Sequence, residues 1–374
     1  MGKLLFKPPV LGLKEMQKIW IITLCWAFVQ SVFYIYRYYS TMDLVHLYKL
    51  TGTFEFWPDF LSNLIISVFG GIIGGAILVS KRYTTNHQKY FEYGAIASGL
   101  YFILWYLMLA LIGILISGFV IYKLQGKGDS AFDNSIQNLM TNLSTPSFFV
   151  TMAVWGLLVS ATQFVLQIND KFGQGVLWKF LIGKYRRPRE EERIFMFLDL
   201  KGATAIAEKM ESKMFFEMLK EVYKDITVPI IRSLGEIYQY VGDEVVISWS
   251  LDNGIKNNNA LRCFYRIEKT IEGKKSKYLE KYGVVPTFKA GLHFGKSTTG
   301  EIGVIKRDIV YSGDVLNTTS RIQALCNHYN VRILVSSALL QLMKLGAKYI
   351  SIPMGEISLR GKEQKIALNT IQVI

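Results

Sequence analysis

Four long stretches without Asp, Glu, Lys or Arg dominate the first half of the 374-residue chain. They lie at residues 19–36, 60–80, 93–122 and 147–169. Each can supply about 20 apolar residues, which is the length that a helix needs to cross a bilayer. The pattern therefore predicts four transmembrane helices in a membrane domain over residues 1–169.

The basic residues between these stretches predict their orientation. Lys and Arg number four, two, three, two and seven in the successive flanking segments 1–18, 37–59, 81–92, 123–146 and 170–193. Rich and poor flanks alternate, and basic flanks face the cytoplasm. We therefore expect a multi-pass protein of the inner (cytoplasmic) membrane, in contact with the lipid bilayer, whose N- and C-termini are both cytoplasmic.

Segment two contains the sequence FGGIIGGA, in which Gly70 and Gly74 share one helix face, as do Gly71 and Gly75. Small residues at this spacing allow close approach of a neighbouring helix. Packing within the chain is the favoured interpretation, and dimerisation between chains is the alternative. Residues 170–192, rich in Lys and Arg, are predicted to be a juxtamembrane linker with a helix near anionic headgroups, and a solvated spacer is the alternative.

The pattern changes after the linker, and residues 193–374 alternate between short apolar runs and amphipathic segments. This alternation predicts a βαββαβ order with additions, and hence an α/β sheet covered by helices on one side. A loop containing Gly295, Gly300 and Gly303 is expected after the fourth strand, and Asp314 is expected to cap the helix that follows. The predicted elements are strand 193–200, helix 203–235, strands 236–241 and 244–250, helix 256–281, strand 286–294, strand 308–313 and helix 314–330.

Composition narrows the function only a little. Hydrophobic residues make up 51% of the chain and charged residues 19%, as expected for a chain with a membrane half. The net charge of +14 is shared evenly between the two halves and does not indicate a nucleic-acid partner, so we expect none. Three cysteines without a CxxC pair predict no disulfide framework. The four histidines have no metal-ligand spacing.

Two acidic residues end up near each other in the predicted sheet. Asp199 ends the first strand, and Asp243 lies at the tip of the hairpin formed by YQYVGDEVVISW, residues 238–249. Two carboxylates held close together repel each other unless a cation binds between them. Mg²⁺ suits such a site, because it takes hard oxygen ligands from one or two carboxylates and completes its shell with water and phosphate. Ordinary turn chemistry is the alternative reading of the hairpin tip.

A third motif lies on the helix after Asp314. Asn317 and Arg321 are four residues apart and share one helix face. An amide and a guanidinium can bind a sugar oxygen and a crowded phosphate.

Together these motifs resemble the class III adenylate and guanylate cyclase family. FLDLKGAT and YVGDEVV are similar to its two metal motifs, SGDVLNTTSRIQ to its Asn/Arg helix, and FGKSTTGEIG to its dimerisation segment. The resemblance covers about residues 190–374, and it implies a nucleotide cyclase catalytic domain at 193–374 with the ferredoxin-like βαββαβ fold. ATP would be the substrate, with two Mg²⁺ or Mn²⁺ ions per site.

The resemblance also implies roles for individual residues. Asp199, Asp243 and the backbone of Leu200 would bind metal, Asn317 would orient the ribose, and Arg321 would stabilise the transition state. Substrate contacts are expected from Gly202, Thr204, Gln239, Val310, Lys306 and Lys362. A head-to-tail homodimer would share each site between two chains.

The base-reading pair departs from the family pattern, because Gln239 stands where adenylate cyclases commonly have Lys and Val310 where they have Asp or Thr. We expect an adenylate cyclase, with a guanylate cyclase or a non-catalytic membrane receptor as alternatives. A diguanylate cyclase would leave Asn317 and Arg321 without a role. A phosphate-binding loop at AGLHFGKS would depend on Lys296, yet no helix is predicted after it.

Overall fold

A computed structural model describes residues 13–48, 56–80, 131–172, 182–305, 307–358 and 365–374, with the isolated positions 104, 108 and 112. The chain divides into two compact units, Met1–Lys171 and Phe172–Ile374. The predicted span 93–122 lies outside the described residues except at those three positions. Lys306 and Lys362 also lie outside them, as do residues 173–181 of the predicted linker.

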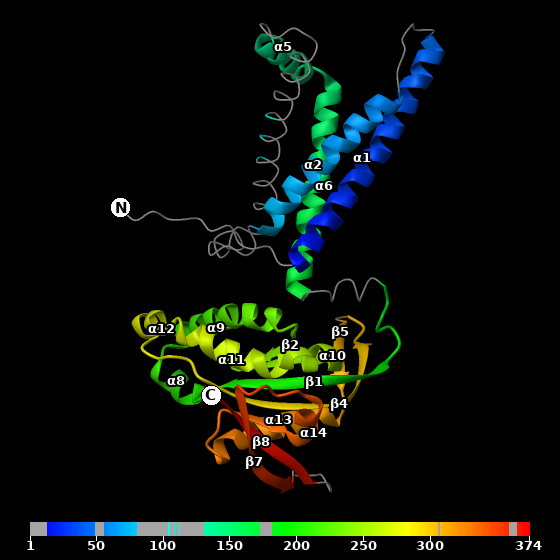
Figure 1. Ribbon diagram of the computed structural model, residues 1–374. Helices are drawn as coiled ribbons and strands as arrows, with labels where there is room; N and C mark the ends of the chain where they lie inside the picture. Colours follow the sequence, from blue (N-terminus) through cyan, green and yellow to red (C-terminus); the bar gives the residue numbers. More distant parts are fainter. Residues whose placement is uncertain are drawn as a thin grey trace. The chain divides into compact units, whose positions relative to one another are not determined.

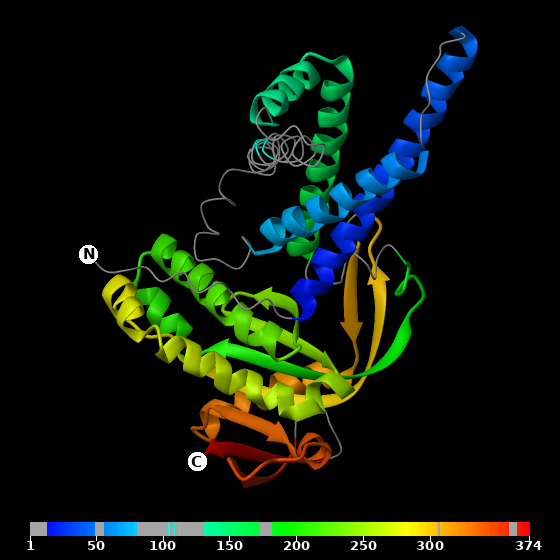
Figure 2. The ribbon, with the colours of Figure 1, turned by 45° about the horizontal axis from the view of Figure 1, so that its top comes forward.

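The described part of the first unit consists of helices (Figures 1 and 2). Small and aromatic residues pack between them. A Cβ atom at Gly71 would lie 2.8 Å from the Thr23 Cα, and one at Gly74 would lie 2.8 Å from the Trp26 ring. Packing of these glycines within the chain is thus confirmed. Trp26 also packs edge-on against Trp155 at 5.7 Å between ring centroids. The described helices are α1 (Leu13–Tyr48), α2 (Phe56–Ser80), α5 (Ala131–Leu143) and α6 (Pro146–Phe172).

Two helices of this unit are long and apolar enough to cross a membrane, among the residues that the structure describes. They contain Met16–Leu47, with 32 residues, and Phe148–Ile168, with 21 residues. The second predicted segment appears as a shorter apolar helix over Asn63–Val79. These helices indicate membrane association, whereas the four-helix bundle and the position of both termini stay predictions.

The second unit is built on one mixed sheet with the strand order β2-β3-β1-β4-β6-β8-β7, and β5 pairs with β4 outside this path. All neighbouring strands are antiparallel except β4 and β6. The first four strands have the predicted βαββαβ connection, so this prediction is confirmed. The strands are β1 (Arg189–Leu200), β2 (Glu236–Val241), β3 (Glu244–Ser250), β4 (Phe288–Ile302), β5 (Asp308–Ser312), β6 (Ile333–Ser336), β7 (Tyr349–Ser358) and β8 (Lys365–Val373).

The helices of this unit cover both faces of the sheet, so the prediction of a single covered face was wrong. Figure 1 shows α9 and α11 on one side of β1 and α13 on the other. The physical reason is that six of the seven residues from Ile194 to Leu200 in β1 are apolar, so both faces of this part of the strand need cover. The helices are α8 (Ala203–Lys209), α9 (Ser212–Arg232), α10 (Leu251–Ile255), α11 (Asn259–Glu272), α12 (Lys275–Tyr282), α13 (Asp314–His328) and α14 (Ser337–Leu342).

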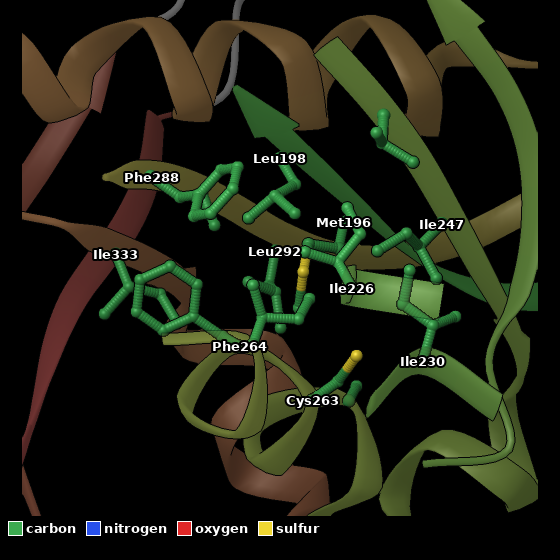
Figure 3. Close-up of a cluster of buried hydrophobic side chains, with 14 of the residues drawn as sticks. Met196, Leu198, Ile226, Ile230, Ile247, Cys263, Phe264, Phe288, Leu292 and Ile333 are labelled. Atoms are coloured by element: carbon green, nitrogen blue, oxygen red, sulfur yellow. The ribbon is translucent and has the colours of Figure 1, made fainter. Parts of the chain in front are cut away.

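Successive residues of β1 face opposite sides of the sheet. Met196 and Leu198 are fully buried in the main core, together with Ile226 of α9 and Phe264 of α11 (Figure 3). The residues between them face α13, where Phe197 belongs to a second apolar cluster. Asp199 comes two residues after Phe197 and therefore faces the same side of the sheet. Its carboxylate thus lies on the α13 face, at the end of the strand.

Several predicted boundaries differ from those observed. The helix predicted over 203–235 is broken at Met210, whose backbone is extended (φ −126°, ψ 143°). The loop expected at Gly295 and Gly300 is the second half of β4, because these residues pair with β1 and β5. Asp314 is the first helical residue of α13, and Gly313 takes the capping position.

A cluster of ion pairs joins α9 to α12. Glu221 accepts hydrogen bonds from Tyr282 Oη at 2.7 Å and Lys281 Nζ at 3.0 Å, and it also pairs with Lys277. Burial raises the pKa of Glu221, but the hydrogen bonds from Lys277 and Tyr282 outweigh it and lower the pKa to about 2. A carboxylate with a lowered pKa stabilises the fold above its ordinary pKa, and this stabilisation is lost as the pH falls toward 2.

We therefore expect Glu221→Gln to lower the free energy of unfolding at pH 7 by about 1–2 kcal/mol, with the difference shrinking below pH 4.5. Thermal unfolding of residues 172–374 between pH 2.5 and 7 measures this. Glu272→Gln is the matched control, because its pair with Lys275 is 67% exposed on the glutamate side. A loss at pH 7 no larger than that of the control would contradict the prediction.

Candidate active site

The hairpin tip is tied to the helix beside it. Gly242 turns the chain with φ +62°, a left-handed conformation that favours glycine. Tyr223 Oη of α9 donates a hydrogen bond of 2.6 Å to the Gly242 carbonyl. At the base of the turn, Glu244 is the cross-strand partner of Asp199. The tip therefore holds Asp243 and Glu244 close to the end of β1.

Two donors hold the Asp199 carboxylate. Lys289 is its cross-strand partner on β4, with Nζ 2.9 Å from Oδ2. Gln323 Nε2 of α13 donates to the same oxygen at 3.0 Å. This contact needs a close approach of α13 to β4, which Gly291 permits, since a Cβ there would lie 2.4 Å from the Gln323 nitrogen. Both donors converge on the same oxygen, Oδ2.

Sequence reasoning missed both donors and Glu244. Lys289 did carry a signal, because it is the only charged residue within the apolar run from Phe288 to Phe294. Gln323 carried none, since nothing in the pattern of α13 distinguishes it from other polar helix positions.

The acidic groups Asp199, Asp243 and Glu244 form a carboxylate corner at the end of β1, and its electrostatics favour a bound cation. Burial and the neighbouring Asp199 raise the pKa of Asp243. Burial, Asp199 and Asp243 together raise the pKa of Glu244 to about 7. Three acidic groups thus crowd around the ammonium of Lys289, and a divalent cation would relieve their repulsion.

The donor set fits Mg²⁺ or Mn²⁺. Asp199 and Asp243 offer hard carboxylate oxygens, as these ions prefer. Among the described residues, no group of three or more His, Cys, Asp and Glu side chains is arranged to hold a metal alone. The protein would therefore supply two carboxylates, and water and substrate phosphates would complete the shell. The Leu200 side chain is aliphatic and buried, so only its backbone carbonyl could contribute a ligand.

A pocket of about 380 Å³ lies on the α13 face of the sheet. It contains two of the predicted site residues, Gln239 and Asn317, but neither Asp199 nor Asp243. Val310 is also absent from its wall, although the next residue, Tyr311, contributes to it. The lining residues are Phe197, Tyr238, Gln239, Tyr311, Ser312, Gly313, Leu316, Asn317 and Ser320.

The remaining predicted residues lie around these two features. Arg321 is half-buried one turn after Asn317 on α13. Gly202 precedes α8 with φ +74°, and both Gly202 and Thr204 are exposed. The chain therefore groups Asp199 with Asp243, and Gln239 with Asn317, without placing the two pairs in one pocket.

The alternative of a phosphate-binding loop at AGLHFGKS disagrees with the structure. Strand β4 runs without a break from Phe288 to Ile302, and Lys296 is an exposed residue within it. The phosphate-binding loop needs a strand, a loop and a helix in succession. Replacing Lys296 is therefore expected to leave the activity unchanged.

Comparison with known proteins agrees with this geometry. Residues 186–371 match the family model of the adenylate and guanylate cyclase catalytic domain. Adenylate cyclase 2 of Rhizobium meliloti (strain 1021) is 36% identical over 205 residues, which are 55% of this chain and 56% of the relative. Adenylate cyclase 1 of the same organism is 25% identical over 189 residues, or 49% of this chain and 28% of the relative.

The chain thus spans about half the length of the first of these relatives and about a quarter of the second. A solved structure of a bacterial light-regulated adenylyl cyclase shares the fold with a TM-score of 0.51 and 18% identity. That similarity covers 61% of this chain and 66% of the other.

Proposed function

Because residues 186–371 form an adenylate and guanylate cyclase catalytic domain, we propose that the chain is a membrane-anchored adenylate cyclase. It converts ATP into 3′,5′-cyclic AMP and diphosphate. The observation that carries the proposal is the pair Asp199 and Asp243, held together at the end of β1, where burial and Asp199 raise the pKa of Asp243 and Lys289 is the neighbouring cation. The two adenylate cyclases of Rhizobium meliloti favour this activity among the cyclases.

The reaction forms a bond between the ribose 3′-oxygen and the α-phosphorus and breaks the bond to diphosphate, while the 3′-hydroxyl proton passes to water. Bound Mg²⁺ or Mn²⁺ would supply the acidification of the hydroxyl and the neutralisation of phosphate charge. Asp199 and Asp243 hold the ions, and Asn317 orients the ribose. Arg321 stabilises the charge that develops on the α-phosphoryl oxygens.

Lys289 gains a role in this scheme. Its ammonium neutralises Asp199 in the structure, at 2.9 Å. With a metal ion bound to Asp199, the Lys289 ammonium would be available to contact the diphosphate, as a point charge suited to phosphate. Lys306 and Lys362, outside the described residues, stay candidates for further phosphate contacts, as do Gly202 and Thr204.

The site is complete only in a dimer. The pocket with Gln239 and Asn317 lacks the carboxylates, so a head-to-tail homodimer would bring the carboxylates of one chain to the pocket of its partner. The membrane unit anchors the enzyme in the inner membrane through four helices and keeps both termini in the cytoplasm. Holding two chains in the bilayer also raises their local concentration.

The activity itself is tested on the purified chain in detergent with Mg²⁺ or Mn²⁺ and either ATP or GTP, with products identified by mass. Cyclic AMP is the expected product. Absence of any cyclic nucleotide at high protein concentration would contradict the proposal.

ATP is expected to be the better substrate, with a higher kcat/KM than GTP. Gln239 lines the pocket and its amide can both donate and accept, so it can pair with the adenine edge. Val310 offers no side-chain hydrogen bond, and guanine has one more polar group to leave unpaired, at a cost of about 1–3 kcal/mol. We expect Gln239→Glu to move the ATP/GTP ratio of kcat/KM toward GTP by about tenfold.

Gln341→Glu, an exposed position on α14, is the matched control and should leave the ratio unchanged. A wild-type preference for GTP would overturn the assignment of ATP. An unchanged ratio in Gln239→Glu would show that residue 239 does not read the base.

A further inference from the structure

A buried tyrosine lies just before the cyclase domain. Tyr185 is only 1% exposed, although it belongs to the turn that precedes β1 and lies one residue outside the matched family range. Its backbone carbonyl accepts a hydrogen bond from the Glu301 amide of β4 at 3.1 Å. Pro188 packs nearby against Gly300, where a Cβ would meet it at 3.4 Å. The segment from Tyr185 to Pro188 is thus docked on β4.

The Tyr185 hydroxyl begins a chain of polar contacts. It donates to Glu191 at 3.1 Å, and Glu191 in turn accepts from Arg193 Nη1 at 3.0 Å. Arg193 is 4% exposed, and its Nη2 bonds to Glu236 at 3.0 Å and to Ser248 at 3.1 Å. The guanidinium is therefore held from three strands, β1, β2 and β3.

The chain of contacts ends at the candidate nucleotide pocket. The Arg193 guanidinium lies 4.6 Å from the centroid of the Tyr311 ring, a cation–π geometry. Tyr311 packs edge-on against Tyr238 at 4.8 Å, and its backbone amide donates to the Tyr238 hydroxyl at 3.3 Å. Both tyrosines line the pocket. Arg193 itself does not line it, so any effect of Arg193 on a nucleotide acts through these rings.

We propose that Tyr185 and Arg193 are positioning residues for the nucleotide: through Glu191 they fix the Tyr311 wall of the pocket. Nucleotide affinity then depends on the docking of the segment before β1. By linkage, a bound nucleotide strengthens that docking by the same factor. This inference rests on the proposed function for the identity of the ligand, but its contacts belong to the chain alone.

The test measures binding apart from turnover. The full chain in detergent is titrated with 3′-deoxy-ATP and Mg²⁺, a probe that lacks the attacking hydroxyl, and KM and kcat for ATP are measured in parallel. Tyr185→Phe removes one hydroxyl and keeps the buried ring. Arg193→Lys keeps the charge but loses the planar fork.

We expect each variant to raise the Kd for 3′-deoxy-ATP and the KM for ATP about three- to tenfold, the range in which such networks modulate coupling. We expect kcat to stay within about twofold. Tyr282→Phe is the matched control, because it also removes a tyrosine hydroxyl bonded to a glutamate but lies on α12. It should lower the melting temperature without changing the Kd.

Wild-type affinity in Tyr185→Phe would overturn the proposal, whatever happens to Arg193→Lys, which has the greater chance of misfolding. A wild type that binds 3′-deoxy-ATP but forms no cyclic nucleotide would refute only the proposed function, and the Kd comparison would still decide. A wild type that binds no nucleotide would refute both.

Discussion

Replacing Asp199 or Asp243 by alanine will lower cyclic nucleotide formation by about a thousandfold or more. Each residue supplies one of the two carboxylate ligands proposed for the metal ions, so its loss removes charge that would hold them. The fold should persist, because the three acidic groups of this corner repel one another and the loss of one relieves that repulsion. The measurement is turnover with saturating Mg²⁺ or Mn²⁺, together with the melting temperature.

Asp199→Asn and Asp243→Asn separate charge from shape and should be equally inactive. Lys296→Ala serves as the control for an exposed residue of the same sheet and should retain nearly full activity. Direct titration with Mn²⁺ gives a second readout, in which the Asp variants should bind the ion more weakly. Full activity in either alanine variant would refute the two-carboxylate assignment.

Mixing two inactive variants will restore activity if the site is shared between chains. A heterodimer of Asp199→Ala and Arg321→Ala has one site with intact carboxylates from one chain and an intact arginine from the other, and a second site with both defects. Heterodimers isolated with two different affinity tags should therefore show about half of the wild-type activity per dimer.

If each chain instead held a complete site, every site in the heterodimer would keep one defect and the mixture would stay inactive. That outcome, with heterodimers demonstrably present, would exclude the shared site. Arg332→Ala replaces Arg321→Ala in the control mixture, since Arg332 lies outside both the pocket and the carboxylate corner and pairs with Glu268. This mixture should also show about half of the wild-type activity per dimer. Both of its chains keep Arg321, and only the Asp199→Ala chain carries a defect.

The sequence predicted the strands of the sheet better than the arrangement of the helices that pack on it. The end of an apolar strand at Asp199 and a turn at Gly242 were enough to expect that two carboxylates meet, and the structure brings them together. Their metal-binding role stays a proposal. The position of α13 could not be predicted. An uninterrupted apolar run such as Ile194–Leu198 in β1 shows that both faces are buried, but it does not show which helix covers which face.

Other misses have local causes. Gly295 and Gly300 indicated a loop, yet both take part in strand pairing, because long-range partners on β1 and β5 override the weak preference of glycine. Gln323 reaches Asp199 only through the close approach of α13 at Gly291, which no periodicity of the chain encodes. The Tyr185–Arg193 contacts likewise depend on the register between β1 and β4.

The alternation along β1 constrains how this protein can diverge. Residues such as Met196 and Leu198 can be exchanged for other apolar residues of similar volume, since such a change affects only the packing of the core. An insertion or deletion of one residue before Asp199 is different, because it moves every following side chain to the opposite face. Such a change would turn the Asp199 carboxylate into the core and an apolar side chain toward Gln323. Point substitutions can therefore accumulate in this strand over long periods, whereas its length between Arg193 and Asp199 must remain constant.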